Sequence, residues 1–130
     1  GGVVPDNPGS YTIPTELRLN HWALSGNWTM EQEATRLNAA SGQIAYRFHA
    51  RDVNLVMGPA VSGTSARFQV LLDGHPPRAA RGIDVDGDGD GTVVEQRLYQ
   101  LIRQPGPVTE HTFEITFLDP DVEVYVFTFW

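Results

Sequence analysis

The stretch from residue 43 to residue 57 reads QIAYRFHARDVNLVM, and it holds two runs in which every second side chain is apolar. Successive side chains of a β-strand point to opposite faces of a sheet. This period of two therefore predicts two strands, Gln43–His49 and Val53–Met57, each with one face on a core. The alternating apolar residues are Ile44, Tyr46 and Phe48 in the first run and Val53, Leu55 and Met57 in the second.

Further strands are predicted on both sides of this stretch. Ala66–Leu72 and Thr112–Leu118 alternate in the same way, whereas Val122–Trp130 is apolar on both faces. A strand that is apolar on both faces is either covered on both sides or meets another domain. Met30–Ala40 also fits a helical turn or two, but strand is preferred there because strand patterns flank it. Weaker strand patterns occupy Trp22–Leu24, Asn27–Glu31, Ala34–Leu37 and Leu98–Arg103.

The number of strands predicts the fold class. Thirteen Gly and nine Pro are spread along the chain, which suits short strands joined by tight turns. Roughly eight to ten strands in one small domain indicate an all-β antiparallel sandwich of the jelly-roll or immunoglobulin-like kind. Residues 1–10, GGVVPDNPGS, are predicted to be a linker from a preceding domain, and residues 11–130 to form the sandwich.

Composition argues against several classes of function. Nine basic and sixteen acidic residues give a net charge of −7, which disfavours binding to a nucleic-acid backbone. The chain has no cysteine, which excludes disulfides, cysteine-ligated metal centres and thiol catalysis within this segment. No apolar run approaches the ~20 residues of a membrane-spanning helix, so no membrane insertion by this segment is expected.

Residues 84–95, DVDGDGDGTVVE, match the spacing of an EF-hand calcium loop. Alternate carboxylates on a tightly turning chain can converge on one hard cation. The pattern predicts a possible Ca²⁺ site. The competing interpretation is a solvated acidic hairpin loop, because no helix is predicted on either side and Asp-Gly repeats are common at hairpin tips. The candidate ligands are Asp84, Asp86, Asp88, Asp90 and Glu95.

A carbohydrate site is the second candidate. Proteins bind sugars by stacking exposed aromatic rings on C–H faces and by hydrogen bonds from planar polar groups. The aromatic candidates can equally be core residues, and the polar ones can be a solvated sheet face. An enzyme would instead need two carboxylates, or a His–carboxylate pair, that converge in a cleft. The candidate glycan-binding residues are Trp22, Trp28, Arg47, His49, Arg67 and Tyr99.

Four runs together resemble a known family. They are LNHWALSGNWTMEQEATRL from residue 19, IAYRFHARDVNLVMGP from residue 44, the acidic loop followed by RLYQLIRQ, and TFEITFLDPDVEVYVFTF from residue 112. They resemble the C-terminal domain of DipZ-type proteins, which are bacterial membrane-anchored, thioredoxin-like cytochrome c biogenesis proteins. The resemblance implies a sandwich like a carbohydrate-binding module that follows a thioredoxin-like domain on the extracytoplasmic side. The redox cysteines of that family belong to the preceding domain, so no catalytic residue is placed here.

Two functions follow as expectations. The first is a non-catalytic module of an extracytoplasmic thiol–disulfide oxidoreductase that binds a carbohydrate or cell-envelope glycan. The second is a structural domain that docks on the preceding thioredoxin-like domain or on a client protein. The docking hypothesis predicts an exposed apolar patch around Val122, Val124 and Val126, and burial of that patch under the domain's own strands would remove its main support.

Overall fold

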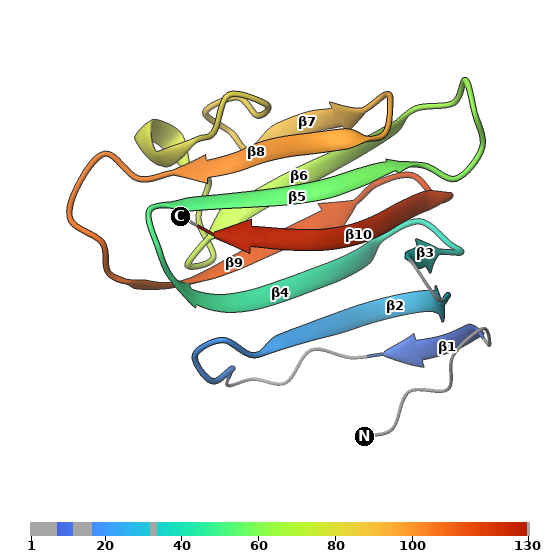
Figure 1. Cartoon of the computed structure of the whole chain (residues 1–130), viewed down its shortest axis with the longest axis horizontal. Helices are drawn as coiled ribbons and strands as arrows, with labels where there is room; N and C mark the ends of the chain where they lie inside the picture. Colours follow the sequence, from blue (N-terminus) through green and yellow to red (C-terminus); the bar gives the residue numbers. More distant parts are fainter. Residues whose placement is uncertain (1–7, 12–16, 32–33, 130) are drawn as a thin grey trace.

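The computed structural model describes residues 8–11, 17–31 and 34–129, and within them it is an antiparallel β structure, which confirms the predicted fold class. The strands form one curled sheet in the order β7-β6-β9-β4-β2-β3-β10-β5-β8, with β1 paired to β2 (Figure 1). Their bounds are β1 Pro8–Tyr11, β2 Trp22–Met30, β3 Thr35–Leu37, β4 Gly42–His49, β5 Asp52–Pro59, β6 Ala66–Leu72, β7 Asp90–Val93, β8 Arg97–Arg103, β9 Glu110–Phe117 and β10 Val122–Phe129, with a short 3-10 helix at Arg78–Ala80.

The curled sheet makes two layers that share β2. We call β8, β5, β10 and β3 the β5 layer, and β7, β6, β9 and β4 the β9 layer. The first half of β2 pairs with β4 and the second half with β3. Gly26 lies between the halves with a φ of +107°, and a Cβ there would approach the Cα of Gly42 to 2.8 Å. Trp22–Leu24 and Asn27–Glu31 were predicted as two separate strands, but one strand, β2, continues through Gly26 and changes layers.

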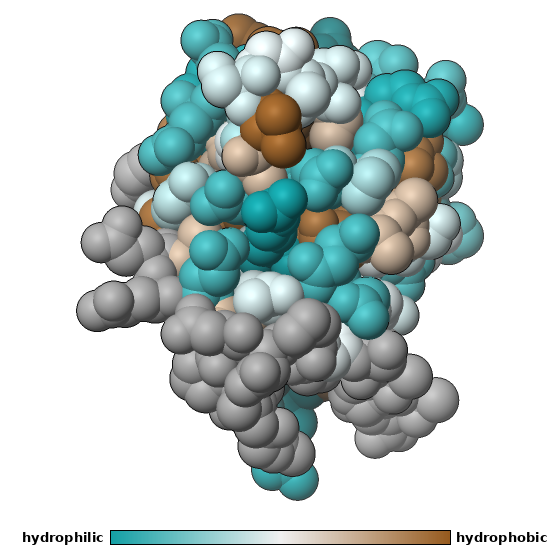
Figure 2. All heavy atoms as spheres, turned by 90° about the vertical axis from the view of Figure 1, so that its right-hand side faces the viewer, coloured by the Kyte–Doolittle hydropathy of each residue, from teal (hydrophilic) through white to brown (hydrophobic). Residues whose placement is uncertain are grey.

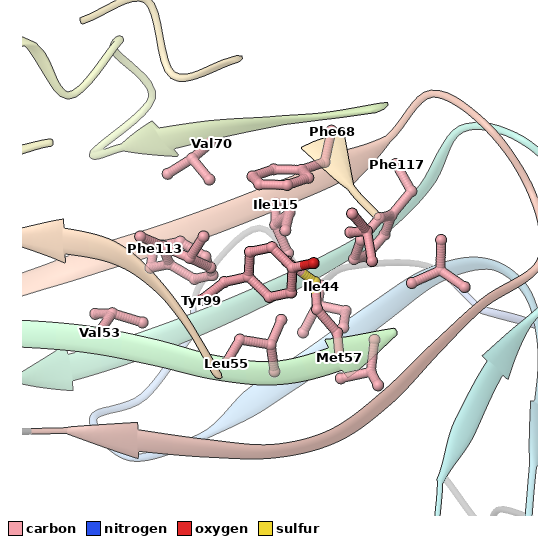
Figure 3. Packing of buried hydrophobic residues seen from close by; sticks show 14 of the residues in the cluster. Ile44, Val53, Leu55, Met57, Phe68, Val70, Tyr99, Phe113, Ile115 and Phe117 are labelled. Carbon is pink, nitrogen blue, oxygen red and sulfur yellow. The ribbon is translucent and has the colours of Figure 1, made fainter. Parts of the chain in front are cut away.

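Side chains from both layers meet in one hydrophobic core (Figure 3). The alternation predicted the inward face correctly, because Ile44, Leu55 and Phe113 are all buried. Tyr99 lies among them in Figure 3, and its hydroxyl forms hydrogen bonds with the backbone of the turn between β7 and β8. The predicted strand in Met30–Ala40 is confirmed by β3.

The last strand differs from its sequence pattern because it contains a β-bulge. The pairing of β10 with β5 shifts register between Val124 and Val126. Val124 lies opposite the buried Met57, but Phe127 lies opposite the buried Leu55, so the inward set changes from valine to phenylalanine at the bulge. Val126 faces outward and is 50% exposed. The strand therefore reads as apolar on both faces because its inward-facing residues change at the bulge. The outward-facing side of β10 is not covered at Val126.

Two other boundaries were missed. β1 pairs with β2 from Pro8↔Thr29 to Tyr11↔Gly26, so residues 8–10 belong to the sheet rather than to the predicted linker. β7 begins at Asp90, inside the stretch interpreted as an acidic loop. Residues 1–7 of the linker and Trp130 of the last predicted strand lie outside the described residues.

The end of the sandwich on the right of Figure 1 is mainly polar. Figure 2 shows this end with hydrophilic side chains over most of its described surface and hydrophobic ones in small, separated areas. Scattered apolar residues are ordinary on a protein surface and do not mark a docking face. A larger apolar surface lies in a groove between the two layers, lined by β2, β4 and β10.

Candidate functional site

An apolar groove of about 340 Å³ lies between the two layers. The first halves of β2 and β4 supply one wall and β10 supplies the other, while Thr35 of β3 lies at one end. We call it the aromatic groove, because five of its residues carry aromatic rings with part of their surface accessible. Its lining residues are Trp22, Leu24, Thr35, Ile44, Tyr46, Val124, Tyr125, Val126, Phe127 and Phe129.

Three rings of the groove, those of Tyr46, Phe127 and Phe129, pack against one another. Trp22 lies directly opposite Tyr46 on the neighbouring strand, and its side chain is 53% exposed. The Tyr46 ring centroid lies 4.6 Å from that of Phe129 and 5.8 Å from that of Phe127. Such contacts hold the rings in fixed orientations, so the groove presents a preformed aromatic surface to a ligand.

Few polar side chains reach the groove. The Thr35 hydroxyl donates to the Met30 sulfur at 3.3 Å, and the Tyr125 hydroxyl donates to Glu123 at 3.3 Å. The groove therefore selects mainly by shape and apolar contact. The alternation placed Tyr46 on a core-facing side of its strand, and Phe127 and Phe129 in a strand that is apolar on both faces. No local signal separates a core ring from one that lines a groove.

Trp28 and Tyr99 do not belong to a glycan site, which corrects the prediction. Both side chains are 0% exposed. The Trp28 indole N–H donates to the carbonyl of Ser25 at 2.9 Å, and the Tyr99 hydroxyl donates to the carbonyl of Glu95 at 2.7 Å. Their polar atoms are thus satisfied inside the protein, and no ring face is open to a sugar.

Arg47, His49 and Arg67 lie on the outer face of the β9 layer, as the alternation predicted. Arg47 is engaged by Glu110 at 2.8 Å and by the Thr112 hydroxyl at 2.8 Å. Because Trp22 faces the groove between the layers, it does not share a surface with these residues. Of the predicted glycan set, only Trp22 lines the aromatic groove.

Arg67 is held by a carboxylate in a two-pronged ion pair. Its guanidinium donates to both oxygens of Asp119 at 3.0 Å, and its backbone N–H donates at 2.9 Å. These hydrogen bonds, strengthened by the charge of Arg67, lower the pKa of Asp119 to about 2. A carboxylate whose pKa is lower in the folded than in the unfolded chain stabilises the fold above the unfolded pKa, about 3.9.

We predict that this stabilisation is present above pH 4 and is lost as the pH falls toward 2. Asp119→Asn should lower the midpoint of urea unfolding slightly at pH 6, and the midpoint should then fall less between pH 4 and pH 2 than in the unchanged protein. Because the ion pair is exposed, the difference between the two proteins should be smaller in high salt. Asp121→Asn removes a carboxylate of the same turn that pairs with Arg36 at 3.0 Å and leaves the Arg67 pair intact, so it controls for the loss of an exposed ion pair. An unchanged pH slope in Asp119→Asn would contradict the assignment.

A His–carboxylate pair is present on the surface. His111 Nδ1 contacts the Asp73 carboxylate, and His111 Nε2 lies 2.7 Å from the Thr109 hydroxyl. Burial raises the pKa of Asp73, but hydrogen bonds from His111 and the Thr112 N–H, with the charges of His111 and Arg47, outweigh it and leave that pKa lowered. None of these residues lines the aromatic groove, so the pair required by an enzyme hypothesis does not coincide with that groove.

The acidic loop divides into two parts. Asp86, Asp88 and Asp90 each place a carboxylate oxygen within 4.8 Å of the others, on the exposed surface. Asp84 instead accepts hydrogen bonds from the Gln100 N–H at 2.7 Å and from Arg97 at 2.9 Å. The Asp84 carboxylate therefore links the acidic loop to β8.

The three clustered carboxylates also have partners within the protein. Asp86 Oδ1 accepts the backbone N–H groups of Asp88 at 3.0 Å and Asp90 at 2.9 Å, and Asp88 pairs with Arg78 at 2.8 Å. Glu95 lies 3.7 Å from Arg97. The predicted five-ligand set is thus reduced to a three-carboxylate cluster, and Ca²⁺ binding there stays a prediction.

Comparisons with known proteins agree with this architecture. A family described as "Thioredoxin like C-terminal domain" matches residues 1–129. Protein DipZ of Mycobacterium bovis and Protein DipZ of Mycobacterium tuberculosis are each 29% identical over 76 residues, which is 58% of this chain. The matched part spans about a tenth of each relative, since it covers 10% of their length.

Two solved structures share the fold. A family two carbohydrate esterase from Clostridium thermocellum, in complex with cellohexaose, superposes with a TM-score of 0.65 and 12% identity over 85% of this chain and 31% of its own. A family two carbohydrate esterase from Cellvibrio japonicus gives a TM-score of 0.64 and 14% identity over 85% of this chain and 30% of its own. At these identities the likeness concerns the fold alone.

Proposed function

The chain belongs to the family of thioredoxin-like C-terminal domains, and on that premise we propose that it is the non-catalytic binding module of an extracytoplasmic thioredoxin-like thiol–disulfide oxidoreductase. The ligand site of this module is the aromatic groove. The chain itself carries no cysteine, so thiol chemistry belongs to another part of such a protein. Among the described residues there is no helix long and apolar enough to cross a bilayer.

The first ligand class that we propose is a carbohydrate or cell-envelope glycan. The observation that carries it is the half-exposed indole of Trp22 beside Tyr46, at the groove. A sugar ring can stack its C–H face on such a platform. One structural neighbour was solved with cellohexaose, which supports testing β-linked glucose oligomers among the ligands.

Titration of the domain with cello-oligosaccharides and envelope polysaccharide fragments, followed by tryptophan fluorescence and amide NMR shifts, tests this proposal. We expect shifts at Trp22 and Tyr46, and about tenfold weaker binding for Trp22→Ala, because stacking contributes roughly 1 kcal/mol beyond area burial. Leu98→Ala removes a similarly exposed apolar side chain away from the groove and should bind normally. If none of these sugars changes the fluorescence or the amide shifts, with or without calcium, the result would count against a glycan ligand.

The second candidate is docking on the thioredoxin-like domain or on a client polypeptide. The exposed patch predicted around Val122, Val124 and Val126 is mostly absent, because Val122 and Val124 are buried under the domain's own strands. The observation that still favours docking is the groove itself, whose lining is apolar and contains exposed Val126. Apolar grooves of this kind are a common site for peptide recognition.

We also propose weak Ca²⁺ binding at the cluster of Asp86, Asp88 and Asp90. Its support is the convergence of three carboxylates, and the expected affinity is that of extracellular modules, about 0.1–1 mM. Calcium should shift the amide signals of residues 86–90 and raise the melting temperature slightly, and Asp88→Asn should weaken both effects. Equal responses to calcium and to sodium at matched ionic strength would argue against a site.

A further inference from the structure

The aromatic groove is bordered by an open strand edge. β10 pairs with β5 from Val122 to Phe129, but on its other side β3 pairs only with Glu123 and Val124. Figure 1 shows β3 beside only the right-hand end of β10. Within the described part of the chain, Val126–Phe129 therefore has a strand partner on one side alone. In an antiparallel strand, alternate N–H and C=O groups point to each side, so this edge offers peptide groups to another strand.

The opposite layer continues beneath this edge. Trp22 and Leu24 of β2, with Ile44 and Tyr46 of β4, form the wall of the groove that faces β10. A further strand of the β5 layer would lie roughly 4.8 Å from β10 and about 10 Å above β2 and β4, which is the spacing of packed sheets. The aromatic groove occupies this position. A strand bound there would continue the β5 layer in line with the short β3.

We propose that an extended segment of a partner polypeptide binds the aromatic groove by adding a strand to the edge of β10 at Val126–Phe129. Its backbone pairs with β10, and its alternate apolar side chains contact the accessible rings of Trp22 and Tyr46. The inference rests on the proposed binding role of the groove and names a polypeptide rather than a glycan as its ligand. The net charge of −7 favours a segment with basic residues.

The shape of the edge favours a single strand over a second copy of this chain. Edge-to-edge pairing of two β10 strands would join the β5 layers of two copies into one sheet. In each copy, however, β4 and β2 lie beyond the edge of β10, as Figure 1 shows. These extended layers would collide before the two edges met, whereas one extended segment fits above them.

A synthetic peptide of alternating valine and threonine with a lysine at each end tests the inference. Its control is the same peptide with alternate backbone amides N-methylated, which keeps the side chains but removes the N–H donors. We expect saturable binding, slowed amide exchange within Val126–Phe129, and at least about tenfold weaker binding of the N-methylated peptide, as expected for the loss of one or two hydrogen bonds. The amides of β7, at the opposite end of the strand order, should not change.

The outcomes separate this inference from the proposed function. Equal binding of both peptides, or protection away from Val126–Phe129, would overturn strand addition. If no peptide binds but an oligosaccharide shifts Trp22, the inference falls and the glycan-binding function stands. If neither ligand perturbs the groove, both fall. Val126→Lys, which places a positive charge on an exposed lining residue beside the edge, should weaken binding of the lysine-flanked peptide. Leu98→Lys, on β8 and outside the groove, should not.

Discussion

Replacing Trp28 with alanine is expected to lower the free energy of unfolding by about 3–5 kcal/mol, with a fall in Tm of roughly 10–20 °C. Trp28 is fully buried, and its ring packs edge-on to Phe117 with centroids 6.0 Å apart. Truncation leaves a cavity between the layers that the surrounding strands cannot close. It also leaves the carbonyl of Ser25 without the indole donor. Urea and thermal unfolding followed by circular dichroism measure the loss.

Trp22→Ala is the matched control, because it makes the same substitution six positions earlier in the same strand. The Trp22 side chain is half exposed, so we expect its truncation to cost under about 1 kcal/mol while weakening ligand binding in the aromatic groove. If Trp28→Ala fails to fold, Trp28→Phe keeps part of the ring and should lose less stability. Equal stability losses at Trp22 and Trp28 would refute the assignment of one ring to the groove and the other to the core.

Gly89→Ala is expected to destabilise the protein by about 3 kcal/mol. Gly89 has a φ of +88°, a conformation that costs alanine roughly 1–2 kcal/mol. Its Cβ would also lie 2.1 Å from the carbonyl oxygen of Val70, so the acidic loop must move away from β6 at a further cost of about 1–3 kcal/mol. The Gly89 carbonyl accepts the Val70 N–H at 2.7 Å, and this movement would strain that bond. Denaturant unfolding reports the change.

Variants of two other glycines separate the backbone cost of Gly89→Ala from its steric cost. Gly74 has a φ of +79° with no atom within 4 Å of an added Cβ, so Gly74→Ala should show only the backbone cost of about 1–2 kcal/mol. At Gly87 nothing lies within 4 Å and φ is not in the left-handed range, so Gly87→Ala should be close to neutral. If Gly89→Ala cost no more than Gly74→Ala, the close approach to Val70 would not be real. The same variants show whether the carboxylate cluster depends on this packing, since Asp88 and Asp90 flank Gly89.

Strand positions and inward faces were predictable because they depend on local order along the chain. A strand has a period of two, so Ile44 and Phe48 in β4, or Phe113 and Ile115 in β9, identify their own buried face without knowledge of their partners. The outward placement of Arg47 and Arg67 follows from the same rule. The family resemblance extended this fold-level prediction to the likeness with carbohydrate-binding modules, but it assigned no site residue.

The site required the tertiary structure, because each of its features depends on a distant strand. The bulge in β10 changes the inward residues from Val124 to Phe127, and only the register against β5 reveals it. Trp22 and Trp28 look alike in sequence, but Trp22 pairs with Tyr46 of β4 and Trp28 pairs with Leu37 of β3. The chain's own order of side chains thus determined an all-β sandwich. Long-range pairing decided which rings fill the core and which line the groove, because burial is set by the strands that pack across a residue and not by its neighbours in sequence.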